Sequence, residues 1–186
     1  SIEFSGGKYG NGMLTKEKPL KVEAIALPGR EEMRSMLVVE LQDYVVCCTH
    51  LSLNEEDRQA SIKLIQQFTE KYTTKPVFLA GDFNALPNSE TIKMIEDYKA
   101  FLLVDTTTDI STTFHNFSGS ETNKKIDYIY IDSETALNPY KAECWTDNKD
   151  GLRHPHTIQY FKRDKGGFHP TQKPVSLMEY LIKTYT

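Results

Sequence analysis

Short apolar stretches alternate with polar segments along the chain, and most of them have the length of a β-strand. Leu20–Leu27 alternates apolar and polar residues with a period of two, which predicts a half-buried strand. Met36–Leu41 and Tyr44–Thr49 are separated only by Gln42 and Asp43, so we expect an antiparallel hairpin. Further strands are expected at Met13–Thr15, Val77–Ala80, Phe101–Val104, Ile126–Ile131 and Ala142–Trp145.

Two segments between these strands carry helical signals. Asn54 is a good N-cap with acidic residues directly after it, and the helix that it begins is expected to end near Tyr72. A second, shorter helix is expected from a cap at Asn88 or Ser89 to Tyr98. Strands separated by helices place the chain in the α/β class. The apolar stripe of the first helix consists of Ile62, Leu64, Ile65 and Phe68.

Three of the predicted strands carry polar residues that a buried core does not normally hold. The stretch YVVCCTH ends at His50, and VFLAGDFN bears Asp82 and Asn84 in a turn at its end. The stretch KKIDYIY holds Asp127 near its start. Ends of buried strands are where α/β sheets place their chemistry, because rigid backbone holds the side chains and the next loop leaves room for a ligand. We therefore expect these four residues to meet in one site.

Each of these residues also has an ordinary structural explanation. His50 can be a hydrogen-bonded histidine at a strand end, and Asp82 and Asn84 are common turn formers. Asp127 can be a carboxylate on an edge strand that faces water. Against the turn explanation, Asp82 and Asn84 follow a nearly all-apolar strand and, one residue apart, would share an outward face.

Composition and charge narrow the class of protein. Of the 186 residues, 39% are hydrophobic and 26% charged, as in ordinary globular domains, and no run approaches a membrane helix. Residues 148–186 carry 7 Lys and Arg against 3 Asp and Glu, a net charge of +4. Because the whole chain has a net charge of −4, residues 1–147 carry −8. A segment this acidic needs a metal ion to supply a positive field if it acts on phosphate. The three cysteines have no CxxC spacing and are expected to be free thiols.

Six stretches, taken in order, resemble motifs of the endonuclease/exonuclease/phosphatase superfamily, whose members include deoxyribonuclease I. The resemblance covers about residues 8 to 146, and it depends on the order and spacing of the stretches together. The stretches are KYGNGMLTKEKPL (Lys8–Leu20), REEMRSMLVVEL (Arg30–Leu41), THLS (Thr49–Ser52) with Arg58 following, VFLAGDFNALP (Val77–Pro87), TTF (Thr112–Phe114) and KIDYIYI (Lys125–Ile131).

The resemblance implies a two-sheet α/β sandwich with a site at the sheet edges that hydrolyses phosphodiesters. His50 would bind the scissile phosphate or donate a proton to it, because histidine suits proton transfer near neutral pH. Asp82 and Asn84 would bind metal and phosphate and orient the attacking water, and their hard oxygens suit Mg²⁺ or Mn²⁺. Asp127 would orient a second histidine. The substrate would be a nucleic acid or another phosphodiester, and no basic stripe with interleaved aromatic residues favours nucleic acid.

Two motifs of that superfamily have no counterpart here. The first, near the N-terminus of the superfamily's domain, contains an asparagine and the glutamate that is a main metal ligand. The second, near its C-terminus, is Ser-Asp-His-x-Pro. Arg153-His154-Pro155-His156 stands about where the late motif would fall, which makes His154 a candidate for its histidine. Arg153 cannot replace the aspartate as a ligand, because a guanidinium has no lone pair to offer. The sandwich is therefore expected to be incomplete, with an exposed sheet edge that favours self-association.

The end of the chain resembles a different family. HPTQKP followed by VSLMEYLIKTYT is similar to the segment that precedes the cofactor loop in DNA amino-methyltransferases. The catalytic Asp/Asn-Pro-Pro-Tyr motif and the Gly-rich S-adenosylmethionine loop of those enzymes are missing. We expect a partial nuclease-like domain at residues 1–147 and a methyltransferase-like segment at 148–186. The segment should form a strand (Thr157–Phe161), a loop and an amphipathic helix (Val175–Tyr185).

Three functional hypotheses follow from the sequence. The first is a divalent-metal-dependent phosphodiester hydrolase of the nuclease or phosphatase type. The second is a catalytically inactive remnant of the same fold that at most binds a partner, and the two missing motifs favour it. The third is a fragment of a DNA methyltransferase, which depends on the C-terminal segment alone.

Overall fold

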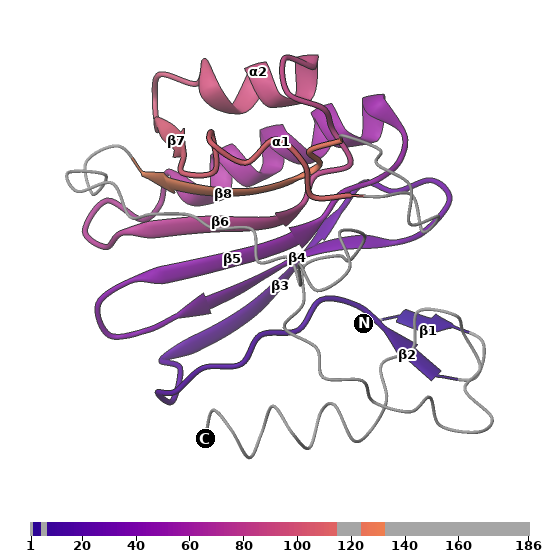
Figure 1. Cartoon of the computed structure of the whole chain (residues 1–186). Helices are drawn as coiled ribbons and strands as arrows, with labels where there is room; N and C mark the ends of the chain where they lie inside the picture. Colours follow the sequence, from indigo (N-terminus) through magenta and orange to yellow (C-terminus); the bar gives the residue numbers. More distant parts are fainter. Residues whose placement is uncertain (1, 5–6, 115–123, 133–186) are drawn as a thin grey trace, which may run out of the picture.

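The computed structural model of the chain describes residues 2–4, 7–114 and 124–132 (Figure 1). Within these residues the chain forms short strands, two helices and the loops that connect them. In chain order the elements are β1 (Ile2–Phe4), β2 (Gly7–Tyr9), β3 (Lys21–Leu27), β4 (Arg34–Glu40), β5 (Val45–His50), α1 (Glu55–Thr69), β6 (Val77–Asp82), α2 (Glu90–Glu96), β7 (Leu103–Asp105) and β8 (Asp127–Asp132).

Strands β3 to β8 form one mixed sheet in the order β3-β4-β5-β6-β8-β7. All neighbouring strands in this sheet are antiparallel except β5 and β6, which are parallel. A tight turn cannot join two parallel strands, and α1 makes the crossover between β5 and β6. Both helices lie over the same face of the sheet (Figure 1). This arrangement places the ends of β5 and β6 next to each other at one end of the sheet.

Local sequence signals account for the hairpin and for both helix starts. The predicted hairpin is confirmed as β4 and β5, and Leu41 N donates to Tyr44 O across its turn at 2.9 Å. The predicted cap of the first helix is also confirmed, because the Asn54 side chain accepts a hydrogen bond from Asp57 N at 3.2 Å. Ser89 caps α2 in the same way.

An apolar core fills the space between the helices and the sheet. The Phe83 ring, directly after β6, meets the rings of Tyr128 and Tyr130 edge-on, with centroids 5.5 Å and 5.6 Å away. All three side chains are buried, so the turn after β6 is fixed to β8 by packing. The other buried core side chains of the central strands and helices include Met36, Val38, Val45, Cys47, Val77, Leu79, Ile62, Ile65, Ile92 and Ile95.

The face of the sheet opposite the helices also carries apolar side chains. Because strand residues alternate between faces, these are the residues between the core positions. One row crosses all six strands through successive register partners, and its two ends, Val22 and Val104, are 58% and 39% exposed. The row consists of Val22, Val39, Val46, Phe78, Ile131 and Val104.

Several expectations from the sequence differ from the structure. Leu64, expected in the apolar stripe of the first helix, is 39% exposed, and α2 ends at Glu96 rather than Tyr98. The strand predicted at Met13–Thr15 is wrong, because no strand of the described residues pairs with this segment. The Asn11 side-chain amide donates to Ser35 O at 2.9 Å, and Thr15 Oγ1 donates to Glu17 O at 2.8 Å. Helix α1 ends at Thr69 and continues only as a turn.

Several other expectations concern residues outside the described ranges. They include the strands at Ala142–Trp145 and Thr157–Phe161, the helix at Val175–Tyr185, the candidate His154 and the whole segment 148–186. Cys47 and Cys48 are free thiols, as expected. Neither helix of the described chain is long and apolar enough to span a membrane.

Candidate functional site

Three neighbouring strands bring polar residues into one row at the same end of the sheet. Strand β5 pairs with β6 so that His50 lies opposite Asp82. Strand β6 pairs with β8 so that Asp82 lies opposite Asp127. Partners in adjacent strands present their side chains on the same face. The fold therefore places together three residues that are far apart in the sequence.

His50 and Asp82 approach each other directly. Nε2 of His50 lies 3.5 Å from Oδ2 of Asp82, and the side chains are 31% and 30% exposed, so a ligand can reach both. Burial lowers the pKa of His50 and the positive charge of Arg34 lowers it further, whereas Glu32 and Asp127 act in the opposite direction, so the site favours the neutral imidazole. Burial raises the pKa of Asp82, and the backbone N–H of Asn84 acts in the opposite direction.

The tight turn after β6 orients Asp82 and Asn84. Asn84 N donates to Asp82 Oδ1 at 2.8 Å, and Asn84 Nδ2 donates to Leu51 O at 2.8 Å. These bonds leave the side-chain carbonyl oxygen of Asn84 as its ligating atom. Asn84 has a φ of 47°, a left-handed conformation that asparagine tolerates better than most residues. The turn therefore presents one carboxylate and one amide oxygen within a fixed frame.

Asp127 is held from two sides. On one side Phe83 N donates to Ile126 O at 2.8 Å, which ties the start of β8 to the turn after β6. On the other side Thr113 Oγ1 accepts the backbone N–H of Asp127 at 3.1 Å. Burial raises the pKa of Asp127, and the hydrogen bond with Thr113 lowers it by favouring the charged form.

Arg34 lies in the same region and was not singled out as a site residue by the sequence. It begins β4, its side chain is only 9% exposed, and it forms a 2.8 Å ion pair with Glu32. Its charge lowers the pKa of both His50 and Asp82, which places a cation beside the row. The motif REEMRSMLVVEL contains Arg34, but only the register of β4 with β5 reveals which strand end it lies near.

The start of α1 is fastened to the loop between β3 and β4. Asp57 accepts hydrogen bonds from the backbone N of Arg30 at 2.9 Å and from its Nη2 at 3.0 Å. Arg58, which belongs to the matching sequence stretches, donates through Nη1 to the backbone oxygens of Ser52 and Leu53. Arg58 therefore stabilises the loop after His50 rather than extending toward a ligand.

The described residues supply part of a metal site. Asp82 and Asn84 offer two hard oxygens, which is the donor type that Mg²⁺ and Mn²⁺ prefer. Within the described ranges no group of three or more His, Cys, Asp and Glu side chains is arranged to hold a metal ion. Mg²⁺ usually keeps several waters and binds one or two carboxylates together with substrate phosphates, so two protein oxygens fit such an ion.

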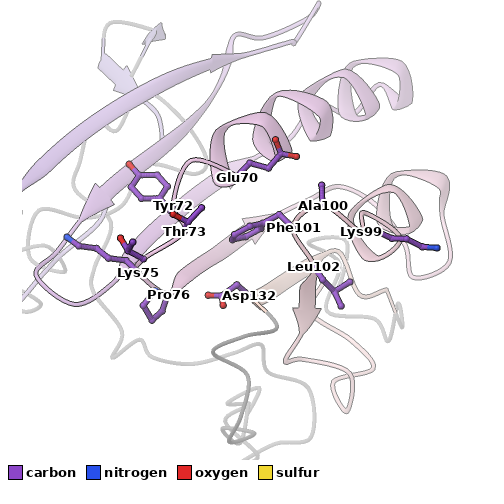
Figure 2. Close-up of a pocket in the computed structure, with 11 residues that line it drawn as sticks. Glu70, Tyr72, Thr73, Lys75, Pro76, Lys99, Ala100, Phe101, Leu102 and Asp132 are labelled. Carbon is purple, nitrogen blue, oxygen red and sulfur yellow. The ribbon is translucent and has the colours of Figure 1, made fainter.

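A cavity of about 700 Å³ lies at the opposite end of the sheet (Figure 2). Its lining includes Tyr72, Lys75, Phe101 and Asp132. Asp132 accepts the N–H of Val77 at 2.8 Å, and Lys75 Nζ pairs with a carboxylate oxygen at 2.7 Å. These charged groups already have structural partners, and the cavity is remote in the fold from the row of His50.

The sequence model of the Endonuclease/Exonuclease/phosphatase family matches residues 2–146, which include every element described above. The chain belongs to this family. The match covers the strands that bear His50, Asp82 and Asp127, so the site lies within the family domain. A comparison with curated protein sequences found no match.

Solved structures similar to this one show the same fold. The endonuclease/exonuclease/phosphatase from Bacteroides vulgatus is 21% identical, with a TM-score of 0.55 over 62% of this chain and 54% of its own. The mannosyl-6-phosphatase of Bacteroides thetaiotaomicron is 17% identical, with a TM-score of 0.53 over 62% and 53%. A humanized D. rerio TDP2 is 19% identical, with a TM-score of 0.50 over 66% and 55%.

The chain spans about half the length of these structures. Its fold is an incomplete α/β sandwich of the deoxyribonuclease I type, as the sequence predicted. Its described part holds a six-stranded sheet, with both helices on one face, and the two-stranded sheet of β1 and β2 (Figure 1).

Proposed function

We propose that this protein hydrolyses phosphate esters with a divalent metal ion at the row formed by His50, Asp82 and Asp127. The observation that carries the proposal is the register of β5, β6 and β8, which aligns these three residues at one sheet end. A histidine 3.5 Å from a carboxylate, with a cationic side chain nearby, is an arrangement suited to an anionic ester. Membership of the family supports this class of reaction.

His50 acts at the scissile phosphate. Its neutral imidazole can accept a proton or donate a hydrogen bond to a phosphate oxygen, depending on which nitrogen carries the hydrogen. Asp82 lies beside Nε2 and would stabilise the imidazolium that forms when His50 takes up a proton. Partial exposure of both side chains gives the ester access to them.

Asp82 and Asn84 would hold Mg²⁺ or Mn²⁺ through their side-chain oxygens. The bound ion would offset the charge of the phosphate and make a water molecule more acidic. The hydrogen bonds from Asn84 N to Asp82 and from Asn84 Nδ2 to Leu51 O fix both side chains before a ligand arrives. Such preorganisation saves the cost of ordering them during the reaction.

Asp127 would orient a second histidine, for which His154 is the sequence candidate outside the described residues. Arg34 would bind a non-bridging phosphate oxygen after exchanging its ion pair with Glu32 for the substrate. A guanidinium suits this role because its donors form a fork that matches two phosphate oxygens.

The preferred substrate is a phosphodiester, with nucleic acid as one member of that class. One structural neighbour is named as a mannosyl-6-phosphatase, so a phosphomonoester is the natural comparison substrate. The phosphate groups of the two ester types differ in charge. An assay that uses both esters distinguishes a diesterase from a phosphatase.

The test measures hydrolysis of bis(p-nitrophenyl) phosphate and p-nitrophenyl phosphate with Mg²⁺ or Mn²⁺. We expect the diester to be cleaved, and His50→Ala and Asp82→Ala each to lower the rate by about 100-fold or more. Asp43→Ala, which removes an exposed carboxylate from the β4–β5 turn, is the control and should keep the rate. Equal rates in all four proteins would mean that the row is not the site.

The inactive-remnant hypothesis predicts no metal-dependent hydrolysis by the unmodified chain with either ester. The DNA methyltransferase hypothesis depends on the segment 148–186, which lies outside the described residues and outside the match to the family. It predicts binding of S-adenosylmethionine, which can be measured by calorimetry on the same preparation.

A further inference from the structure

The part of β8 that carries Asp127 has no neighbouring strand on its β7 side within the described part of the chain. Strand β7 is only three residues long and pairs with Tyr130 to Asp132 of β8. Within the described residues, no strand therefore continues β7 alongside Ile126 and Asp127. Backbone N–H groups in such a position need an acceptor from another source, or they remain open to water and the strand end can move.

The hydroxyl group of Thr113 supplies that acceptor. Thr113 Oγ1 accepts the backbone N–H of Ile126 at 3.0 Å and that of Asp127 at 3.1 Å. A threonine hydroxyl has two acceptor lone pairs and one hydrogen, so both acceptor positions are used. The Thr113 hydroxyl also lowers the pKa of the Asp127 carboxyl group by favouring its charged form. One hydroxyl thus holds the backbone at the point where β8 presents Asp127.

The loop that carries Thr113 is itself fastened at both ends to the residues that precede β8. At its far end, Thr113 N and Phe114 N donate to Lys124 O at 2.9 Å and 3.0 Å. At its near end, the buried ammonium of Lys125 pairs with Asp105 Oδ2 at 2.7 Å and donates to Thr107 O at 2.7 Å. The Lys125 side chain is only 5% exposed, so water does not compete for these bonds.

We propose that Thr113 is a positioning residue of the site, which holds Asp127 in register with Asp82 through its hydroxyl group. The inference rests on the proposed function, since it assigns Thr113 a role in that reaction through Asp127. Thr113 acts on the geometry of the row and does not itself contact the reacting atoms. Its oxygen replaces the carbonyl group that a longer β7 would have supplied.

Thr106 provides a matched comparison within the same loop. Its Oγ1 donates to Ile129 O at 2.8 Å, so it also bonds the edge of β8 through its hydroxyl. Ile129 lies two residues beyond Asp127, and the Thr106 side chain is not bonded to the site residues. Loss of the Thr106 hydroxyl therefore removes a similar bond at the same strand edge without releasing Asp127.

The experiment compares Thr113→Val, Thr113→Ser and Thr106→Val in the whole chain by amide hydrogen exchange and by kinetics. Valine keeps the shape of threonine and removes the hydroxyl, whereas serine keeps the hydroxyl. In Thr113→Val we expect the amides of Ile126 and Asp127 to exchange about tenfold faster, with protection in β5 and β6 unchanged. Thr113→Ser should restore slow exchange, and Thr106→Val should leave these two amides as they are.

In the diester assay we expect Thr113→Val to lower kcat about 10- to 100-fold with little change in KM, and Thr113→Ser to recover most of it. Unchanged exchange at Asp127 in Thr113→Val overturns the proposal, as does acceleration spread over the whole sheet or a failure of serine to rescue. If the unmodified chain hydrolyses no ester, the proposed function fails, and the exchange measurement still decides whether Thr113 holds Asp127.

Discussion

Gly81 controls the geometry of the site at the scale of a single residue. Its φ is +145°, and a Cβ atom at this position would lie 1.9 Å from the carbonyl oxygen of Thr49. Strand β5 therefore approaches β6 too closely for any side chain, directly before the two strands present His50 and Asp82. The glycine is required both by the backbone conformation and by the space.

We predict that Gly81→Ala lowers the free energy of unfolding by roughly 3 kcal/mol, because the backbone leaves its glycine-only conformation and β5 must move away. Ester hydrolysis should fall with it, since the separation of His50 and Asp82 changes. Urea denaturation followed by circular dichroism measures the first effect. Gly12→Ala is the control, because no atom lies within 4 Å of a Cβ added there, and it should be nearly neutral. Equal stability of the two variants would contradict this account of Gly81.

The candidate site residues could be predicted from the sequence, because each is a polar residue in or directly after an apolar strand. That signal singled out His50, Asp82, Asn84 and Asp127, which the structure places at one end of the sheet. Arg34 could not be predicted in this way, because an arginine close to acidic residues in the sequence is typical of an ordinary protein surface. Its place beside His50 depends on the pairing of β4 with β5, which the local sequence does not encode.

At the scale of elements, one ion pair fixes the start of α1 against the loop that leads into β4. The side chain of Asp57 is 10% exposed and bonds the backbone and the guanidinium of Arg30. The hydrogen bond from the backbone N–H of Arg30 lowers the pKa of Asp57 most, and the Arg30 side chain lowers it further. The helix and the loop beside Arg34 are thereby connected.

We predict that Asp57→Asn lowers the melting temperature at pH 7 and that the difference from the unmodified chain shrinks in acid. A carboxyl group whose pKa is lowered by folding stabilises the fold above its unfolded pKa, and this contribution is lost as the pH falls through the folded pKa. The gap should therefore close below the ordinary value of 3.8. Scanning calorimetry from pH 7 to pH 3 measures it.

Glu56→Gln is the matched control for this pair. Glu56 also binds Arg30, at 2.9 Å, but its side chain is 80% exposed, and exposed ion pairs contribute little to stability. Its melting temperature should stay close to that of the unmodified chain at every pH. A pH-independent loss in Asp57→Asn would show that packing rather than charge accounts for the effect.

Element boundaries were predictable where a local signal exists. The start of α1 at Asn54 follows from a side chain that accepts a backbone N–H within the same turn. Its end had no comparable signal, since neither glycine nor proline follows within the first turn, and the expected boundary near Tyr72 lay beyond Thr69. The strand predicted at Met13–Thr15 is absent because a strand needs a pairing partner, and within the described chain no strand pairs with this segment.

For the whole molecule, the edge strand β3 is the feature from which we expect self-association. Strand β3 is seven residues long and ends the sheet within the described part of the chain. An unpaired strand edge favours pairing with another copy, and Val22 on this strand is 58% exposed.

We predict that the chain elutes ahead of the monomer position in size-exclusion chromatography, because two copies can pair along β3. Val22→Lys should shift the elution toward the monomer, since a charged side chain on an edge strand opposes pairing. Leu86→Lys is the control, because Leu86 is an exposed apolar residue of the loop between β6 and α2, and β6 is not a neighbour of β3 in the sheet. A monomer at all concentrations would refute self-association through β3.

The most direct test of the central claim is metal removal and restoration in the diester assay, with the unmodified chain and Asp82→Asn side by side. We predict that chelation abolishes hydrolysis by the unmodified chain and that added Mn²⁺ restores it. Asp82→Asn, which keeps the size of the side chain and removes its charge, should recover about 100-fold less activity at the same Mn²⁺ concentration. Hydrolysis that survives chelation, or equal recovery by Asp82→Asn, would contradict a metal-dependent site at the end of β6.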